Sequence, residues 1–280
     1  MKLKLKHYFK LARPANLVLV ATVVLITATF FTPFPSIWKF LLAIICPTFI
    51  TAAGNALNDR CDVEIDRINK PNRPLPLGII SIEGAKGFMI AMFILGNIAG
   101  LILGFWSLFI SLFIVTPLLY WYAYRLRHVA LLGNIIVAFL SALTFLFAAQ
   151  AFGDIKLGYV PFVFTFIISV VREIIKDLED IDGDEAHESK TLPVMIGETP
   201  TRIIAGIIIA LFFPTIPIPY VTGMYGKWFF FFGSIGVVIP MLIIMIQLFQ
   251  VKRIINYHQI AVVLKIVMFI GLITIFVGRF

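Results

Sequence analysis

The chain contains nine apolar runs, each long enough to cross the hydrocarbon core of a lipid bilayer as a helix. About 20 predominantly apolar residues span the roughly 30 Å of hydrocarbon in a typical membrane. Exposed to water, these runs would have no stable fold, so they predict a membrane-embedded chain. The predicted spans are residues 15–31, 39–57, 86–105, 107–122, 132–151, 159–176, 203–222, 228–249 and 258–277.

The composition excludes a soluble domain of this size. Of 280 residues, 60% are hydrophobic and only 14% are charged, and the mean hydropathy is +1.00. The apolar runs are far longer than the strands of a membrane barrel, which need about 10 residues each. The sequence therefore predicts an all-α integral membrane protein, a single polytopic domain over residues 1–280 built as a bundle of nine transmembrane helices.

The basic residues predict how this bundle is oriented. With nine spans, eighteen of the 23 lysines and arginines lie on the side of the N-terminus, and only four lie on the opposite side. Because cytoplasmic loops carry the excess of lysine and arginine, the N-terminus is predicted to face the cytoplasm in a multi-pass protein of the cell membrane. The net charge of +8 reflects the same asymmetry, and we expect no nucleic-acid partner.

Fourteen of the fifteen carboxylates fall in two short stretches, Asp59–Glu83 and Glu173–Glu198. Two sets of residues within them repeat one spacing of four, three and four. The first acidic set is Asn55, Asp59, Asp62 and Asp66, and the second acidic set, 118 residues later, is Glu173, Asp177, Asp180 and Asp184. On a continuous helix each set would fall within an arc of roughly 60°. Each set continues a predicted span, and Gly183 is a candidate end for the second helix.

Carboxylates spaced by one helical turn repel each other unless a cation lies between them. Clusters of oxygen ligands select hard cations, and Mg²⁺ binds through a few carboxylates together with substrate phosphates. Two such stripes facing each other would hold divalent cations and, through them, a diphosphate. The alternative is a pair of solvated, acidic helix ends. The repeated spacing and the scarcity of acidic residues elsewhere favour the binding site.

Basic and aromatic residues flank both sets. Lys70 and Arg73 follow the first set and Lys190 follows the second, where they could clamp diphosphate oxygens or simply anchor the cytoplasmic face. Residues at the ends of the first and fourth spans are candidates for substrate contact or for interfacial anchoring. The candidate substrate-binding residues are Arg13, Asn16, Asn55, Lys70, Arg73, Tyr120, Tyr122, Arg125, Arg127, Arg172, Lys176 and Lys190. Polar residues inside the spans are expected to bridge helices; they are Asn97, Asn134, Gln150 and Gln247.

Over its whole length the chain resembles the UbiA family of intramembrane prenyltransferases. The motif Asn-Asp-x-x-Asp-x-x-x-Asp is matched at 58–66, and Asp-x-x-Asp-x-x-x-Asp is matched at 177–184. The Asn-Arg-Pro-Leu-Pro segment at 72–76 and the Lys-Thr pair at 190–191 also match. The acidic motif regions are therefore 55–76 and 172–193.

The resemblance implies that Mg²⁺ bridges both motifs and a prenyl diphosphate, in an intramembrane substrate cavity open to the cytoplasmic side. It implies catalytic roles for Asn58, Asp59, Asp62, Asp66, Asp177, Asp180 and Asp184. It implies metal binding by Asn58, Asp62, Asp66, Asp177, Asp180 and Asp184. The departing diphosphate would leave positive charge on the allylic carbon, which an acceptor then attacks.

Within this family the second motif and the Lys-Thr-Leu-Pro segment are most similar to archaeal digeranylgeranylglyceryl phosphate synthases. That similarity implies geranylgeranyl diphosphate and geranylgeranylglyceryl phosphate as substrates, with the lipid bilayer around them. Arg125 and Arg127 stand where a lysine is common in the family. Two alternatives remain: transfer to an aromatic acceptor such as 4-hydroxybenzoate or a naphthoate, or prenylation of haem or chlorophyll. A cation transporter is a distant alternative, because it would place carboxylates at mid-bilayer.

Overall fold

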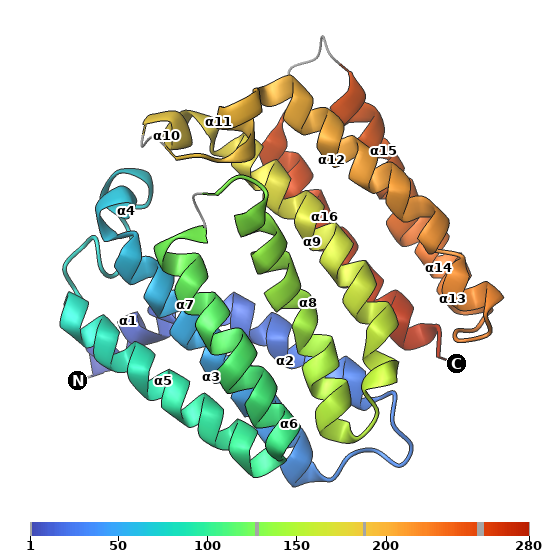
Figure 1. Cartoon of the computed structure of the whole chain (residues 1–280), viewed down its shortest axis with the longest axis horizontal. Helices are drawn as coiled ribbons and strands as arrows, with labels where there is room; N and C mark the ends of the chain where they lie inside the picture. The colour runs from blue at the N-terminus through green and yellow to red at the C-terminus, as the bar shows by residue number, and fades with distance from the viewer. Residues whose placement is uncertain (1, 127–128, 187–188, 251–254, 280) are drawn as a thin grey trace. The chain divides into compact units, whose positions relative to one another are not determined.

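The computed structural model describes residues 2–126, 129–186, 189–250 and 255–279, whose regular secondary structure is helical (Figure 1). Within this part of the chain there is no named strand, and one isolated parallel bridge pairs Val129 with Lys190. The chain divides into two compact units. The N-terminal unit comprises Met1–Leu126 and Thr144–Gly158, and the C-terminal unit comprises Arg127–Leu143 and Tyr159–Phe280.

The N-terminal unit is built around α3 and α5, which run side by side (Figure 1). They approach closely at Gly96 of α5, where an added Cβ would lie only 3.1 Å from the carbonyl oxygen of Cys46. The helices of this unit are α1 (Lys2–Leu11), α2 (Pro14–Ala28), α3 (Ile37–Cys61), α4 (Val63–Asn69), α5 (Ile82–Leu103), α6 (Phe105–Leu108), η1 (Phe109–Val115), α7 (Thr116–Tyr124), the C-terminal part of α8 (Leu132–Phe152), and η3 (Ile155–Gly158).

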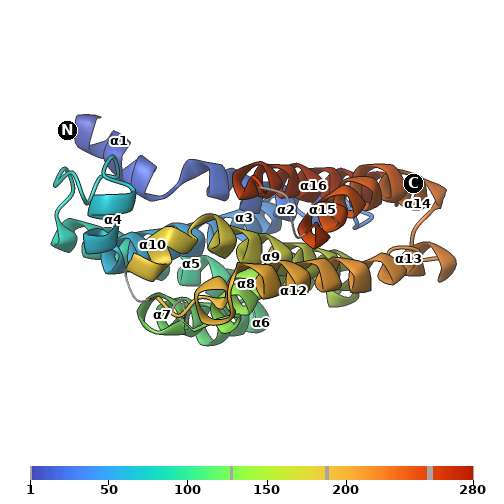
Figure 2. The ribbon, with the colours of Figure 1, turned by 90° about the horizontal axis from the view of Figure 1, so that it is seen from above.

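The C-terminal unit packs α9 against α12 and α16, and α12 against α15. Figure 2 shows α14, α15 and α16 beside one another, with α9 and α12 in a second layer. Its core is apolar, with Ile209, Phe212, Met241 and Leu264 fully buried. After the start of α8, its helices are α9 (Tyr159–Glu179), α10 (Ile181–Ala186), α11 (Leu192–Ile196), α12 (Glu198–Phe212), η4 (Phe213–Thr215), α13 (Ile218–Val221), α14 (Lys227–Gly233), η5 (Ser234–Val238), α15 (Ile239–Phe249) and α16 (Tyr257–Val277).

Eight helical segments of the described chain are long and apolar enough to cross a membrane, and they match eight of the nine predicted spans. They are Ile37–Cys61, Ile82–Leu103, Phe105–Tyr124, Leu132–Phe152, Ile155–Glu179, Glu198–Val221, Lys227–Phe249 and Tyr257–Val277. The first predicted span corresponds to α2, an apolar helix of 15 residues. At about 1.5 Å per residue α2 is shorter than the hydrocarbon core, so the ninth span stays a prediction.

Two of the spans contain a π-helical segment just before a proline. In Phe105–Tyr124, η1 precedes Pro117, and in Lys227–Phe249, η5 precedes Pro240. Proline has no backbone N–H, and its ring crowds the carbonyl four residues earlier, so the ordinary helical hydrogen bond is lost there. A wider i→i+5 turn accommodates this. The Thr116 hydroxyl also donates to the carbonyl of Ser111, five residues back, at 2.8 Å.

Both acidic sets begin on a long helix and end on a short one, so the prediction that each continues its span is wrong for its second half. α3 ends at Cys61, Asp62 is the link, and Asp66 lies on α4. α9 ends at Glu179 and α10 begins at Ile181, so the second break precedes Gly183, the candidate end.

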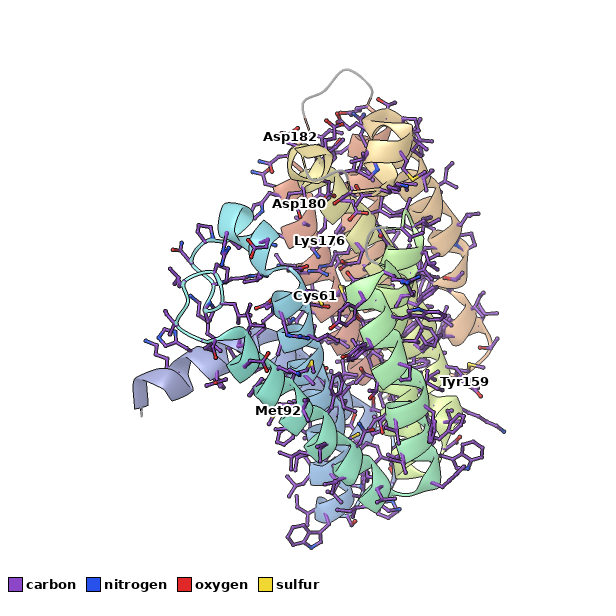
Figure 3. The ribbon with its side chains drawn as sticks, turned by 60° about the vertical axis from the view of Figure 1, so that its left-hand side comes forward. Cys61, Met92, Tyr159, Lys176, Asp180 and Asp182 are labelled. Atoms are coloured by element: carbon purple, nitrogen blue, oxygen red, sulfur yellow. The ribbon has the colours of Figure 1, made fainter. Side chains whose placement is uncertain are left out.

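Backbone hydrogen bonds continue across both junctions. The Asp62 N–H donates to the carbonyl of Asn58 at 2.9 Å, and the Asp180 N–H donates to that of Lys176 at 3.0 Å. Successive motif residues therefore remain one turn apart despite the breaks. Figure 3 shows Lys176, Asp180 and Asp182 in order at the end of α9 and on α10, with Tyr159 at the opposite end of α9.

Candidate active site

In the N-terminal unit the first acidic set is organised around Asp59, which is 2% exposed. Its carboxylate forms ion pairs with two arginines, Arg13 and Arg73. Arg73 lies 3.0 Å from Asp59 and also pairs with Asp66, a second buried carboxylate. A buried carboxylate is costly unless it is paired, so these arginines offset the cost of burying two acidic side chains.

Arg13 reaches Asp59 because the link between α1 and α2 is fixed against α3. The Asn55 side chain donates to the carbonyl oxygen of Ala12 at 2.9 Å, and Leu11 is fully buried against α3 residues such as Leu57. Arg13 itself has a φ of 56°, in the left-handed region that non-glycine residues rarely adopt. The Asn55 amide nitrogen thus binds the link that aims Arg13 at the acidic set, and substrate contact by Asn55 stays a prediction.

Arg73 is held by the loop that follows α4. Leu75 and Ile80 of this loop are buried in the same apolar cluster as Leu11, and the Lys10 side chain donates to the carbonyl of Asn72 at 2.9 Å. The loop therefore has a defined conformation rather than trailing into solvent. Arg73 therefore lies beside both Asp59 and Asp66, and its binding of diphosphate oxygens stays a prediction.

In the C-terminal unit the second acidic set is supported differently. The Asn134 amide on α8 donates to Asp177 Oδ2 at 2.8 Å, so Asn134 bridges helices as predicted. Glu173 is buried and pairs with Arg172 and Lys176, which lie on the same helix. Asp184 and Glu173 act electrostatically on Asp177. The carboxylates of this set therefore repel one another, with neutralisation concentrated on Glu173.

Asp180 lies at the exposed junction of α9 and α10, and Asp184 on α10 is half-buried. Two backbone contacts fix the segment after α10. The Ser189 N–H donates to the Asp184 carbonyl at 2.9 Å, and Lys190 forms a parallel bridge with Val129. The second motif and its following Lys-Thr pair are thus joined within one unit.

The remaining predicted residues lie toward the edges of the units. Asn16, Lys70, Tyr120, Arg125 and Lys190 are exposed, and Tyr122 is half-buried. Arg127 lies outside the described residues.

Sequence reasoning missed two arginines. Arg60, inside the first motif, donates from Nη1 to the Tyr124 hydroxyl at 3.1 Å. Arg202 is 4% exposed and donates to the carbonyl of Gln250 at 2.7 Å, beyond the end of α15, which stabilises that helix end. The sequence did single out Arg60, since it is the one basic residue between Asn58 and Asp66. Nothing in the spacing indicated the contact of Arg202.

The side chains present suit Mg²⁺, because both sets offer the oxygen ligands that this ion prefers. The Asn58 Oδ1 atom is buried and has no hydrogen-bond partner within the described chain, so it is an oxygen donor open to a ligand. Among the described residues no group of three or more histidine, cysteine, aspartate or glutamate side chains is gathered closely enough to form a metal site.

Comparison with known proteins places these motifs in a family. A profile of the UbiA prenyltransferase family matches residues 17–273. The chain belongs to the UbiA prenyltransferase family. It is therefore a prenyltransferase, and the eight long apolar helical segments found in the described part of the chain make this family member a multi-pass membrane protein.

Relatives in this family agree in name. The digeranylgeranylglyceryl phosphate synthase of Pyrococcus horikoshii is 37% identical over 203 residues, covering 72% of this chain and 73% of the relative. That of Sulfolobus acidocaldarius is 37% identical, covering 79% and 80%. That of Methanoculleus marisnigri is 35% identical, covering 87% and 85%.

Solved structures of the family have the same fold. A digeranylgeranylglyceryl phosphate synthase structure superposes with a TM-score of 0.85 at 32% identity, covering 100% of this chain and 99% of the other. A UbiA homologue from Archaeoglobus fulgidus bound to GPP and Mg²⁺ has a TM-score of 0.71 at 19% identity, covering 98% and 99%. At that identity the second likeness concerns the fold alone.

Proposed function

We propose that this chain transfers a geranylgeranyl group from geranylgeranyl diphosphate to the hydroxyl of geranylgeranylglyceryl phosphate, as an enzyme of archaeal ether-lipid synthesis. The observation that carries the proposal is the full-length likeness, at 32% identity, to a solved digeranylgeranylglyceryl phosphate synthase. Curated relatives with the same name at 35–37% identity support it.

In this reaction the bond between C1 of the geranylgeranyl group and the diphosphate oxygen breaks, and its electron pair leaves with the diphosphate. The acceptor hydroxyl oxygen forms an ether bond to C1 and releases its proton. Because negative charge builds on the diphosphate, groups that stabilise that charge lower the barrier. Bound Mg²⁺ would supply such stabilisation as a Lewis acid.

The proposed assignments follow the two motifs. Asn58, Asp62 and Asp66 of the N-terminal unit, and Asp177, Asp180 and Asp184 of the C-terminal unit, would hold Mg²⁺. Arg73 and Lys190 would bind diphosphate oxygens directly, since guanidinium and ammonium groups suit phosphate. Asp59 would act through the two arginines that it aims, Arg13 and Arg73.

We place the N-terminus and both motifs on the cytoplasmic side of the cell membrane, with both units forming a single prenyltransferase domain. Support for this orientation comes from the excess of lysine and arginine on that side. The prenyl chain would lie in a cavity among the helices, where exclusion of water protects the cationic carbon from hydrolysis.

The test is an assay of the purified full-length protein with Mg²⁺ and radiolabelled geranylgeranyl diphosphate. Geranylgeranylglyceryl phosphate and 4-hydroxybenzoate are offered in separate reactions. We expect product with the glyceryl phosphate alone. Product with the aromatic acid alone would overturn the acceptor assignment and keep the prenyl donor, and no product with either would place the acceptor outside both classes.

A further inference from the structure

Arg60 lies inside the first motif, yet it points to a different partner from its neighbours. Successive helical residues are about 100° apart around the axis. Asp59 therefore contacts Arg13 and Arg73, whereas Arg60 on the next position reaches α7, where its Nη1 donates to the Tyr124 hydroxyl at 3.1 Å. The Tyr120 ring packs against Tyr124 with centroids 5.0 Å apart. All of these residues belong to the N-terminal unit.

Arg60 differs from the other buried and half-buried arginines in its ion pairing. Arg13, Arg73, Arg172 and Arg202 are half-buried or buried, and each forms an ion pair with an aspartate or glutamate. Arg60 is also half-buried, but it forms no ion pair within the described residues. Glu64, four residues on, pairs with Arg67 instead.

The guanidinium of Arg60 also has hydrogen-bonding capacity left. Its Nε is buried and has no partner among the described residues. A guanidinium offers five N–H donors in a planar fork that fits phosphate oxygens, and a tyrosine hydroxyl can accept one hydrogen bond while donating another. A half-buried, unneutralised arginine beside a tyrosine hydroxyl therefore has the chemistry of a phosphate site.

We propose that Arg60 and Tyr124 bind the phosphate monoester of the acceptor lipid, on a face of α3 different from the one that Asp59 occupies. This inference rests on the proposed function and names its acceptor subsite. Arg13 and Arg73 already pair with the carboxylates of the first set, so a phosphate on the acceptor needs a cation of its own. Arg60 is the second-last residue of the candidate span Ile37–Cys61, and the ends of a span of this length are expected near the headgroup region.

The test combines a variant with a matched change in the acceptor. Arg60→Gln and Tyr124→Phe are assayed with geranylgeranylglyceryl phosphate and with geranylgeranylglycerol, which has the same hydroxyl and no phosphate. We expect Arg60→Gln to raise the KM for the phosphate acceptor about 10- to 100-fold, the usual cost of losing a charged hydrogen bond. Its KM for geranylgeranyl diphosphate and its kcat/KM for geranylgeranylglycerol should stay at the wild-type values.

Arg67→Gln is the control, because Arg67 is an exposed arginine of the same region whose ion-pair partner among the described residues is Glu64. It should leave both acceptors unaffected. An equal loss with both acceptors in Arg60→Gln would make Arg60 structural and overturn the proposal. So would a rise in KM confined to geranylgeranyl diphosphate, which would move Arg60 to the donor side.

Direct binding separates this proposal from the proposed function and from bilayer lipid. Thermal stabilisation of the detergent-purified protein by geranylgeranylglyceryl phosphate should exceed that by geranylgeranylglycerol, and Arg60→Gln should remove the difference. That result supports the phosphate site even if no ether product forms. If phosphatidylglycerol stabilises the wild type equally well and competes with the acceptor, the site belongs to membrane phospholipid and the proposal fails.

Discussion

The first acidic set, at the end of α3, receives two arginines from segments outside its own helix, whereas the second, at the end of α9, is supported mainly by residues beside it. Asp59 pairs with Arg13, 46 residues away, and with Arg73, 14 residues away. Glu173 pairs with Arg172 and Lys176 on α9 itself. Identical spacing therefore does not imply identical electrostatics.

This difference in ion pairing leads us to expect separate roles for the two sets. The first is largely neutralised by Arg13 and Arg73, whose guanidinium groups have the donor geometry that suits phosphate oxygens. The second keeps carboxylates that repel one another, with Asp177 oriented by the neutral amide of Asn134. Repulsion among carboxylates increases the affinity for a cation, so we expect the second set to dominate metal affinity and the first to dominate diphosphate recognition.

The largest effect should come from removing one motif aspartate from each set. Asp62→Ala and Asp180→Ala should each lower kcat about 1,000-fold or more, because each removes several kcal/mol of charge stabilisation in the transition state. Gel filtration and thermal unfolding in detergent should show that both variants remain folded. Full activity in either variant would show that its acidic set takes no part in the reaction, and the division of roles between the two sets would be wrong.

The second test compares one arginine of each set. Arg73→Ala should raise the KM for geranylgeranyl diphosphate about 10- to 100-fold, because it deletes charged hydrogen bonds, with a smaller change for the acceptor. Arg172→Ala should have less effect, since Lys176 still pairs with Glu173. The measurement is the KM of each variant for geranylgeranyl diphosphate and for the acceptor, from steady-state kinetics. A larger change for the acceptor in Arg73→Ala would move Arg73 to the acceptor side.

The third test concerns the amide that orients Asp177. Asn134→Ala should raise the Mg²⁺ concentration for half-maximal activity about tenfold, the usual effect of losing a group that orients a metal ligand. Mg²⁺-dependent thermal stabilisation should shift by a similar factor. Ser141→Ala is the control, because Ser141 is an exposed residue of α8 bonded to its own helix. An unchanged Mg²⁺ dependence in Asn134→Ala would limit Asn134 to helix packing.

The smallest effect should come from the exposed pair on α4. Arg67→Ala removes an ion pair to Glu64 whose two side chains are 58% and 73% exposed. Solvent-exposed pairs contribute about 0.2–1 kcal/mol, so the midpoint of thermal unfolding should barely move. If Arg67→Ala lowers this midpoint as much as Arg73→Ala does, the number of charges, rather than their burial, determines the stability of this region.

Local patterns in the sequence predicted the parts of the fold that depend on local properties. Apolar runs such as 39–57 and 258–277 correspond to α3 and α16 because hydrophobicity over about 20 residues decides membrane insertion. The breaks at Asp62 and Asp180 escaped prediction, since neither has a proline or glycine to end the helix there. The pairing of Asp59 with Arg13 depends on a link anchored through Ala12 and Asn55, a tertiary contact that spacing does not encode.

The π-helical segment η1 has a consequence for the aromatic residues that follow it. A turn closed five residues apart holds one residue more than an α-helical turn, so side chains beyond it are rotated by about 100° from their α-helical positions. Tyr120 and Tyr124 both lie beyond η1. Their orientation toward Arg60 therefore depends on a phase offset introduced deeper in the membrane. Deleting one residue from η1 would restore the α-helical phase and turn Tyr124 away from Arg60. The hydrogen bond between them would then be lost, although neither residue had been replaced.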